Sequence, residues 1–364
     1  MKRIKLLYII MLLTAAYGAY AVSATSPVFG IYKVDCPADS DTYIGITTTR
    51  APVFTGKVQS VQEGTSNIVA QGEPNWTANQ FVYVAGSQTN HYYLKFASGE
   101  LEGAWYDIKS NGAYFAEIEI GSSELAKVKA NDTFEIIPHW TLSTLFPNGG
   151  GFVSASSMSN SSTLWKYTSW SEANGVEYTI GTDNAFKKSY YYRKGASKSA
   201  WCNAGGKVVS DEVIEPNAFF LVVQPSTSST VCYSSVVPMS ATSIDVYVSA
   251  DSDQDIYMPV PSAVDMTVAD LNEALIDSKI FTSSETAQGV DWLLVYNNEK
   301  TGRDVPADLI CYHRSKNSRQ QWCNIGGSNV NTSTLKAGGA IIFQKKTTGE
   351  ERIARIIFKP NYIK

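Results

Sequence analysis

Three carboxylates surround one tryptophan in the segment from Glu100 to Asp107. Glu100 and Glu102 precede Trp105, and Asp107 follows it. Carboxylates beside an aromatic ring suit sugar binding, and two carboxylates at a suitable separation could cleave a glycosidic bond. Sequence does not supply that separation, and an exposed hairpin turn with a packed tryptophan is the simpler interpretation. Trp105 is therefore a weak candidate for ligand binding.

The three histidines give no recognised metal or catalytic motif. His91, His139 and His313 have no second histidine, cysteine or carboxylate at a metal-ligand spacing. No serine lies in a Gly-x-Ser-x-Gly elbow, although the members of a Ser-His-Asp triad need not be neighbours in sequence. We expect no catalytic residue and no metal site among them.

Asp251, Asp253 and Asp255 alternate like the opening of a calcium-binding loop. The pattern then fails, because position six is Ile256 where the EF-hand loop needs glycine, and position twelve is Ser262 where it needs glutamate. A solvated turn is the favoured interpretation. A weak calcium site at these three aspartates is the alternative, and no other cofactor is expected.

Two candidate hairpin tips are rich in basic residues. They comprise Lys187, Lys188, Arg193, Lys194 and Lys198 on the first hairpin, and Arg314, Lys316 and Arg319 on the second. Such tips could hold anionic glycans or lipid headgroups, because local charge steers partners whatever the net charge. Ordinary solubilising tips explain them equally simply. Arg193, Lys194, Arg314 and Lys316 are therefore weak binding candidates.

The chain has five cysteines, and export would permit disulfides. Cys311 and Cys323 bracket a candidate hairpin, where facing strands can bring Cβ atoms within bonding range. Cys202 lacks the equivalent partner and could pair with Cys232 instead. Cys36 is left over, and a free buried thiol is its preferred interpretation.

One segment that positions these residues occurs twice with the same internal spacing. The first copy has YYYR at 190–193 and WCNAGG at 201–206, and the second has CYHR at 311–314 and WCNIGG at 322–327. Such a recurrence indicates two copies of one β-rich unit. We expect Trp201 and Trp322 to anchor the two cores, because tryptophan buries a large apolar area. A repeated cysteine is better explained by fold than by two identical nucleophiles.

The repeat extends beyond these segments. Residues 38–44 are echoed by 250–258 with a two-residue insertion, and 141–145 correspond to 267–271. About eighty extra residues separate the two segments in the first copy. We infer an insertion at 56–138 that forms a small β-barrel, which a fold tolerates when the ends of the insert lie close together.

Short stretches of aromatic and β-branched residues, separated by turn signals, dominate the rest of the chain. The few helical signals are brief, with a capping box at 267–270 and a single turn at 141–146. We predict an all-β fold of two homologous sandwich-like units in tandem, the first carrying the small barrel. The first unit comprises 25–55 plus 139–240, and the second comprises 241–364.

Residues 1–24 have the basic start and short apolar run of a secretory signal peptide. An uncleaved anchor would need about 17 or more unbroken apolar residues. The leader contains three of the 30 basic residues and none of the 34 acidic ones, so the mature chain has a formal charge of −7. This disfavours nucleic acid as a partner. No later segment is apolar enough to cross a bilayer, so we expect the periplasm, the outer-membrane surface or the exterior.

Several segments together resemble an uncharacterised family of exported proteins found mainly in Verrucomicrobia-type bacteria. These are SDTY at 40–43, RAPVFTG at 50–56, SGELEGAW at 98–105, EIIPHWTL at 135–142, VPM at 237–239 and WLLVYNN at 292–298. They span nearly all of the mature chain, and none is a catalytic signature. The resemblance implies an envelope or extracellular protein and no particular activity. The cysteines depart from the family pattern.

The sequence favours an exported, non-enzymatic binding or structural protein of the cell envelope or extracellular space, with a glycan or a protein as its partner. One alternative is an extracellular polysaccharide-active enzyme using Glu100, Glu102 or Asp107. Another is a subunit of a surface array or filament, for which exposed edge strands would be the sign.

Overall fold

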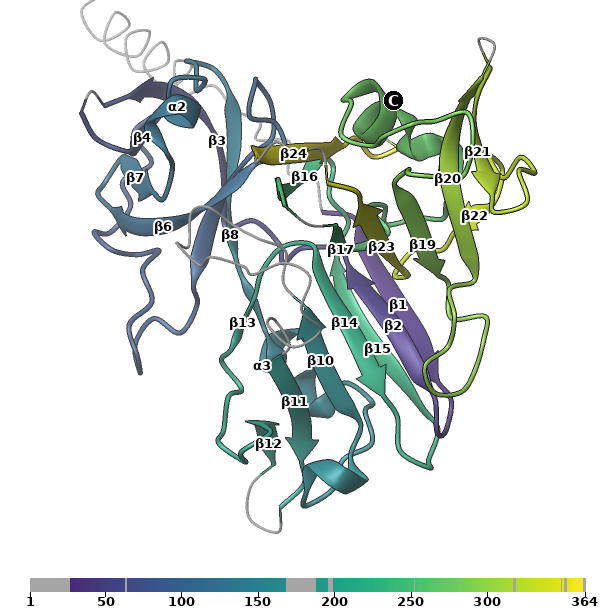
Figure 1. Cartoon of the computed structure of the whole chain (residues 1–364). Coiled ribbons are helices and arrows are strands. Elements are labelled where there is room, and N and C mark those ends of the chain that lie inside the picture. Colours follow the sequence, from purple (N-terminus) through teal and green to yellow (C-terminus); the bar gives the residue numbers. More distant parts are fainter. Residues whose placement is uncertain are drawn as a thin grey trace, which may run out of the picture.

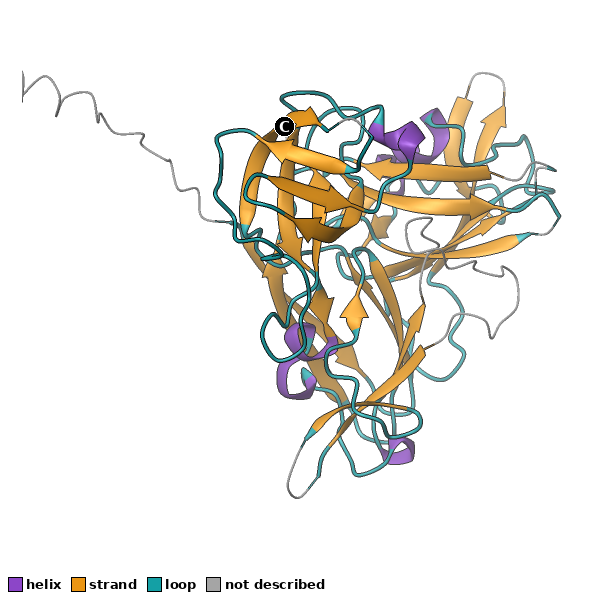
Figure 2. Ribbon diagram, turned by 90° about the vertical axis from the view of Figure 1, so that its left-hand side faces the viewer, coloured by secondary structure: helices purple, strands orange, loops and turns teal. Residues whose placement is uncertain are grey.

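Strands make up most of the folded chain, and the helices are few and short (Figure 2). The computed structural model describes residues 27–62, 64–167, 188–195, 199–251, 253–316, 319–347, 349 and 352–362. The predicted signal peptide lies outside them. Figure 1 separates three bodies: a barrel at the upper left, a first unit at the bottom and a second unit at the upper right. The all-β prediction is confirmed.

The two units have the same strand order. The strands of the first unit are β1 (Phe29–Cys36), β2 (Asp41–Ile46), β9 (Trp140–Thr141), β10 (Thr163–Tyr167), β11 (Lys188–Arg193), β12 (Ala200–Asn203), β13 (Val213–Ile214), β14 (Ala218–Val223) and β15 (Ser229–Val236). Those of the second are β16 (Thr242–Val248), β17 (Gln254–Pro259), β18 (Met266–Thr267), β19 (Trp292–Tyr296), β20 (Leu309–Lys316), β21 (Arg319–Asn324), β22 (Thr334–Leu335), β23 (Ala340–Lys345) and β24 (Arg352–Phe358). The sheet β12-β11-β10-β14-β2 matches β21-β20-β19-β23-β17, and the ribbon β1-β15 matches β16-β24.

Short helices follow the same correspondence. The first unit contains α3 (Leu142–Leu145), η1 (Pro147–Gly149) and η2 (Met158–Asn160), and the second contains η4 (Val268–Leu271) and η5 (Asn272–Asp277). Thr141 and Thr267 begin α3 and η4 with capping boxes. The capping box predicted at 267–270 and the helical turn predicted at 141–146 are therefore both confirmed.

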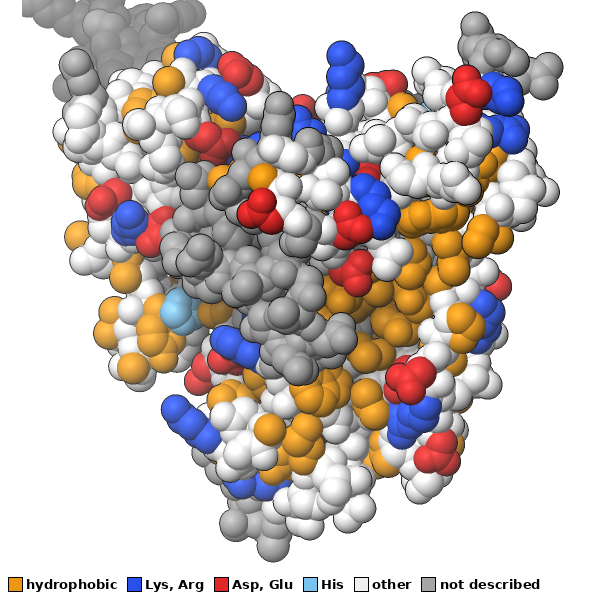
Figure 3. Space-filling model, in the orientation of Figure 1, with side chains coloured by type: hydrophobic (Ala, Val, Ile, Leu, Met, Phe, Trp, Pro, Cys, Tyr) orange, Lys and Arg blue, Asp and Glu red, His pale blue; other side chains and the backbone are white. Residues whose placement is uncertain are grey.

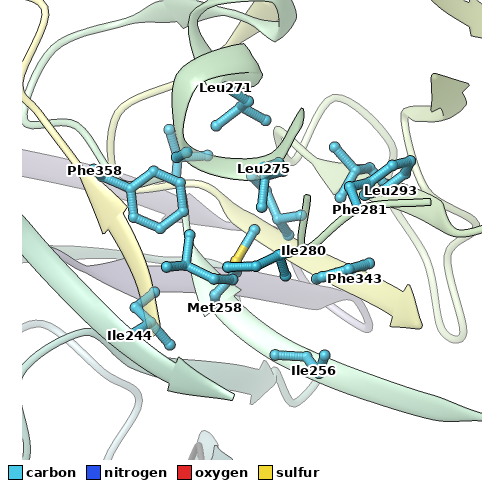
Figure 4. Close-up of a cluster of buried hydrophobic side chains, with 14 of the residues drawn as sticks. Ile244, Ile256, Met258, Leu271, Leu275, Ile280, Phe281, Leu293, Phe343 and Phe358 are labelled. Atoms are coloured by element: carbon cyan, nitrogen blue, oxygen red, sulfur yellow. The ribbon is translucent and has the colours of Figure 1, made fainter. Parts of the chain in front are cut away.

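Each unit encloses one core between its sheet, its ribbon and its helices. Figure 4 shows Leu271 and Leu275 from the helices meeting Met258 and Phe343 from the sheet in the second unit, with Phe358 from the ribbon. Burying apolar surface stabilises a fold by about 25 cal/mol for each Å² removed from water. These clusters therefore make the main contribution to the stability of each unit.

The two repeated tryptophans occupy equivalent places in these cores. Trp201 is 1% exposed and Trp322 is 0% exposed. The indole of Trp201 donates to the carbonyl of Phe146 at 3.1 Å, and that of Trp322 donates to Oδ1 of Asn272 at 2.7 Å. Phe146 and Asn272 are the C-cap residues of α3 and η4. Both predicted anchors are confirmed.

The Asn-x-Gly-Gly part of the repeat forms the same tight turn in each unit. Asn203 Oδ1 accepts from the backbone N–H of Lys207 at 3.0 Å, and Asn324 Oδ1 accepts from that of Ser328 at 2.9 Å. The last glycines, Gly206 and Gly327, have φ of 77° and 79°. Glycine adopts positive φ without steric cost, so the repeated motif is explained by the turn.

A closed barrel lies between β2 and β9 of the first unit. Its strands are β3 (Phe54–Val61), β4 (Asn67–Ala70), β5 (Tyr92–Phe96), β6 (Trp105–Asn111), β7 (Phe115–Ile118) and β8 (Thr133–Pro138), and α2 (Ser122–Leu125) is its one described helix. They close in the order β3-β4-β7-β6-β5-β8 around a separate apolar core. Closure leaves the barrel without unpaired strand edges.

The barrel docks on the second unit, although it is inserted in the first (Figure 1). Arg355 on β24 bonds Asp245 on β16 through Nε at 2.6 Å and Glu124 on α2 through Nη1 at 2.6 Å. Ser243 Oγ donates to the carbonyl of Gly103 at 3.0 Å. Burial opposes the charged form of Arg355, but its carboxylate partners Asp245 and Glu124 raise its pKa. The arginine therefore clamps barrel and ribbon together.

The two units pack around a pseudo-twofold axis. Strand registers place Tyr43 in β2 where Tyr257 lies in β17, and Tyr167 in β10 where Tyr296 lies in β19. The rings of Tyr43 and Tyr296 are 4.0 Å apart, those of Tyr167 and Tyr257 are 4.4 Å apart, and both pairs are tilted by 31°. A contact that recurs with its members exchanged defines a two-fold interface. The chain is thus built like a homodimer joined into one polypeptide.

Strand β1 leaves an apolar surface outside these interfaces. Its outward side chains Phe29 and Ile31 are 62% and 75% exposed. Among the described residues β1 pairs with no strand other than β15. An exposed edge of this kind is what a surface-array subunit would use, and that alternative stays a prediction.

The predicted disulfide between Cys311 and Cys323 is wrong. In the register of β20 and β21, Cys311 faces Asn324, and Cys323 faces Tyr312. Because successive side chains on a strand point to opposite faces, the two thiols lie on opposite sides of the sheet. Cys311 belongs to the main core of the second unit, where burial raises its pKa to about 12.

The predicted pairing of Cys202 with Cys232 is also wrong. Cys202 follows the core residue Trp201 on β12, so its side chain points to the opposite face of the sheet. Cys232 lies on the ribbon strand β15 and is exposed, because its neighbours Val231 and Tyr233 take the core-facing positions. All five cysteines are free, and Cys36 is a buried free thiol as predicted.

Candidate functional site

The basic hairpin tips are partly neutralised. Arg193 Nη1 donates to the carbonyl of Gly206 at 3.2 Å, which supports the tight turn beside it. Lys188 pairs with Glu212 at 2.7 Å, and Lys316 pairs with Glu285 at 3.8 Å. Basic and acidic side chains also intermingle on the face shown in Figure 3. These tips form no concentrated positive surface among the described residues.

The remaining basic candidates add little to this surface. Arg314 has the place of Arg193 in the second unit and lies beside the glycine turn, with Nη1 3.6 Å from a Cβ built on Gly327. Lys194 is exposed. Lys187, Lys198 and the side chain of Arg319 lie outside the described part of the chain.

The three aspartates considered for calcium do not form a loop. Asp255 lies within β17, opposite Gln344. Asp253 forms an ion pair with Lys346 and accepts from the backbone N–H of Thr347 at 3.0 Å. The bond from Lys346 lowers the pKa of Asp253. In the described ranges, no three His, Cys, Asp or Glu residues are grouped to hold a metal ion.

The three carboxylates near Trp105 lie in different surroundings and make different contacts. Glu100 is exposed at a turn. Glu102 Oε1 accepts from the backbone N–H of Ala241 at 3.4 Å, where the barrel meets the link between the units. Asp107 bonds His139 at 2.7 Å. Asp107 is therefore the carboxylate associated with the aromatic cluster around Trp105.

Three neighbouring barrel strands bring this cluster together. In β5 and β6, Tyr93 faces Asp107 and Lys95 faces Trp105, and β8 lies on the other side of β5. The alternate residues of these strands, including Leu94 and Tyr106, fill the barrel core. The cluster is thus on the outer face of the barrel, at positions set by strand register.

His139 completes the cluster just after β8. It is 2% exposed, and its Nε2 lies 2.7 Å from Oδ1 of Asp107. Its ring centre lies 4.5 Å from that of Tyr93 and 5.8 Å from that of Trp105. The side chain of Asp107 remains 35% exposed, and Trp105 is half-buried. A buried imidazole therefore holds a carboxylate that reaches solvent next to an indole.

The second ring nitrogen of His139 is the unusual feature of the site. Nδ1 is buried and has no hydrogen-bond partner within the protein. In the neutral form of the ring, with Nε2–H donating to the carboxylate, Nδ1 is the acceptor nitrogen. A buried acceptor without a donor costs about 1–3 kcal/mol, so such groups usually have a partner from outside the protein. An ordered water, or a ligand group that reached the ring, could supply the missing donor to Nδ1.

The surroundings of His139 fix its backbone. Arg50 Nη1 donates to the carbonyl of His139 at 3.3 Å and to Oδ1 of Asn90 at 2.6 Å. His91 stacks on Tyr83 at 4.2 Å, and its backbone carbonyl accepts from the N–H of His139 at 2.8 Å. Burial lowers the pKa of His91.

A serine lies beside another buried histidine, but the pair is not a catalytic triad. His313 Nδ1 is 2.7 Å from Ser283 Oγ. His313 packs on Trp322 at 5.2 Å as its counterpart Tyr192 packs on Trp201 at 5.5 Å. No carboxylate bonds to His313 among the residues that the structure describes. His313 thus occupies a packing position.

Lys95 is a buried cation next to the cluster. It is 4% exposed, and its Nζ donates to Ser240 Oγ at 2.9 Å. Burial lowers its pKa to about 8, although the carboxylates Glu135 and Glu102 favour the charged form. The amine of Lys95 therefore joins the barrel to the link between the units, and burying its positive charge reduces the stability of the fold.

Replacing Lys95 with methionine should change how stability depends on pH. An unfolded lysine has a pKa near 10.4, so between about pH 8 and 10 the unfolded chain binds more protons than the folded chain. The free energy of unfolding then rises with pH over that interval, and below pH 8 the full cost of the buried charge remains. Lys95→Met should be more stable at pH 7 and should lack this rise.

Urea unfolding of both proteins at pH 7, 8, 9 and 10 measures this prediction. Subtracting the two series removes the contribution of groups that both proteins share. The same pH slope in both proteins would contradict the assignment to Lys95.

Sequence reasoning placed Trp105 and Asp107 together and missed His139. Trp105 and Asp107 are two residues apart on one strand, so their side chains must point to the same face of the sheet. His139 lies 32 residues beyond Asp107 and reaches it only because β5 pairs with both β6 and β8. The local sequence around His139 contains no signal for this contact.

Among the residues described, no helix is long and apolar enough to span a membrane. Comparisons with models of known protein families, with curated proteins and with solved structures each gave no match to this chain.

Proposed function

We propose that the protein is exported and acts as a non-enzymatic glycan-binding component of the cell envelope or extracellular space. Export is supported by the leader-like residues 1–24 and by the resemblance to an exported family. The observation that supports glycan binding best is the unpartnered buried Nδ1 of His139 beside Trp105 and Asp107.

The chemistry of a sugar matches this arrangement. A pyranose ring has an apolar C–H face and several hydroxyl donors. The half-buried indole of Trp105 offers a flat apolar surface for that face, and aromatic anchors of this kind dominate binding energy at protein surfaces. The exposed part of Asp107 and Nδ1 of His139 accept from hydroxyls, and hydrogen bonds to a charged group contribute about 1.5–3 kcal/mol each.

Of the three carboxylates considered for cleavage, only Asp107 belongs to the cluster, so binding fits better than cleavage. Glycoside hydrolysis ordinarily requires two, about 5 to 9.5 Å apart, on either side of the scissile bond. Asp107 is already bonded to His139, Glu102 contacts the link between the units, and Glu100 is exposed at a turn. These contacts favour a recognition site over a hydrolytic pair.

Screening the mature chain on a glycan array, followed by calorimetric titration of the best saccharide, tests the proposal. We expect Trp105→Ala and Asp107→Asn each to weaken binding at least about tenfold, the equivalent of 1.4 kcal/mol. Tyr114→Ala is the matched control, because Tyr114 is a 52% exposed aromatic residue elsewhere on the same barrel. Silence across the array, or equal losses in all three variants, would refute the proposal.

A further inference from the structure

Strand β1 bonds β15 along one of its two edges. Val236 of β15 faces Phe29, yet its backbone groups bond those of Thr49 instead, at 3.1 and 2.8 Å. Hydrogen bonds alternate along an antiparallel pair, so every second residue of β1, starting at Phe29, turns its N–H and C=O away from β15. We call these four residues the open edge: Phe29, Ile31, Lys33 and Asp35.

The open edge is a short row of unpaired backbone groups. Within the described part of the chain nothing bonds its N–H and C=O groups, and β1 has no β-bulge that would turn the edge aside. Pro27 and Pro37 continue the same alternation at its two ends, and proline has no N–H to donate. Complete pairing with another strand is therefore limited to the four residues of the open edge.

The side chains of the open edge form an apolar half and a charged half. Phe29 and Ile31 are 62% and 75% exposed, and Lys33 and Asp35 are exposed on the same face of the strand. The charges of Lys33 and Asp35 cancel, so the edge as a whole is neutral. A strand edge with exposed apolar side chains is a template for pairing with another chain.

The equivalent edge of the second unit is already an interface. The repeat aligns β1 with β16 and places Ser243 where Ile31 lies. The carbonyl of Ser243 accepts from Nδ2 of Asn217 at 2.9 Å, and its Oγ donates to the carbonyl of Gly103 in the barrel. Ser243 is 4% exposed as a result. This edge is a docking surface in the second unit, whereas in the first unit it is bare and has larger apolar side chains.

We propose that the open edge pairs with the open edge of a second copy of this chain, antiparallel and about a two-fold axis. Phe29 then faces Asp35 of the second copy, and Ile31 faces Lys33 of the second copy. Each of the four facing pairs exchanges two backbone hydrogen bonds, so every N–H and C=O of both open edges is bonded. The methylene stem of each lysine covers the isoleucine opposite it.

The residues of the open edge fit a second copy in this one register. Pro27 of each copy lies opposite Pro37 of the other, so neither proline faces a group that needs its N–H. A shift of two residues in one direction sets Lys33 opposite Lys33, and like charges directly opposite each other are destabilising. A shift in the other direction sets Asp35 opposite Pro27 and leaves the carbonyl of Asp35 without a donor. Such self-complementarity is what a two-fold interface requires.

Sedimentation velocity of the mature chain from about 1 µM to 1 mM tests this inference. We expect a reversible dimer and no larger species, because two-fold pairing uses both open edges. Ile31→Lys should raise the Kd of the dimer at least about a hundredfold, since a tenfold effect in each copy acts twice. Ile325→Lys is the matched control, because Ile325 is also 75% exposed, and it should leave the Kd unchanged. Equal thermal midpoints of the two monomeric variants show that both are folded.

Amide hydrogen exchange shows whether the dimer forms through β1. Above the Kd, the four amides of the open edge should exchange at least about tenfold more slowly than below it, while the alternate amides of β1 are already bonded to β15. A chain that stays monomeric at 1 mM, or that grows beyond the dimer, would overturn the inference. So would an unchanged Kd in folded Ile31→Lys, or a dimer in which β1 gains no protection. The test involves none of the residues of the proposed glycan site.

Discussion

Replacing Asp291 with alanine should lower the free energy of unfolding by about 3–5 kcal/mol, because it leaves a buried ammonium without its counter-charge. The side chains of Asp291 and Lys345 are 0% and 1% exposed, and they meet at 2.8 Å. Asp291 also accepts from the backbone N–H groups of Thr282 and Lys346 at 2.6 and 2.7 Å. Chemical unfolding followed by tryptophan fluorescence measures the loss.

The first unit supplies a matched replacement for this ion pair. Strand register makes Ser162 the counterpart of Asp291, and Gln224 the counterpart of Lys345. Ser162 Oγ donates to Oε1 of Gln224 at 2.7 Å, so a neutral hydrogen bond occupies the place of the ion pair. We expect Asp291→Ser combined with Lys345→Gln to recover most of the stability, since the desolvation of two charges is no longer required. Additive losses in the double variant would contradict the equivalence of the two units.

Gly45→Val should destabilise the interface between the units by about 3 kcal/mol. A Cβ at Gly45 would lie 2.3 Å from the carbonyl oxygen of Gly339 and 2.6 Å from Cβ of Pro259. Strand β2 cannot move away to relieve this, because the N–H of Gly45 donates to Gly338 at 2.9 Å and Asn298 holds both backbone groups of Tyr43 at 2.8 Å.

The thermal midpoint of Gly45→Val measures this effect, with Gly121→Val as the control. Gly121 is exposed, has extended backbone angles, and would place its Cβ at least 4 Å from any neighbour. Equal small shifts in the two variants would show that the close approach at Gly45 is not a constraint.

The fold could be predicted from sequence where both copies of the repeat contain the same residues and those residues determine the local structure. Trp201 and Trp322 share their spacing to the glycine turns, and that spacing determines where each β-hairpin edge turns back. Which faces of the two units meet was not predictable. Tyr43 and Tyr296 are separated by 253 residues, and their contact depends on the docking of complete sheets rather than on local preference.

The predicted disulfide between Cys311 and Cys323 failed by one residue of register. Cys311 would share a face of the sheet with the residue opposite it, but that residue is Asn324, and the neighbouring Cys323 points to the other side. A slip of one position reverses every side chain on a strand, and a hairpin pattern alone does not determine the register. Free thiols at Cys311 and Cys323 are the consequence.

The candidate site was half predictable for the same reason. Trp105 and Asp107 share a face because they are two residues apart on β6, whereas His139 comes from beyond β8, a strand paired to β6 only through β5. The Nδ1 atom of His139 is buried without a partner, and this burial depends on the packing of the whole barrel. Sequence alone therefore does not reveal it.

The nitrogen resonances of the His139 imidazole test the proposed site most directly. With the saccharide identified on the array, we expect Nδ1 to shift upfield as it accepts a ligand hydroxyl, while Nε2 keeps its proton bonded to Asp107. Trp105→Ala should abolish the shift at the same ligand concentration. An Nδ1 resonance that stays unchanged while the wild-type protein is saturated with glycan would contradict the account.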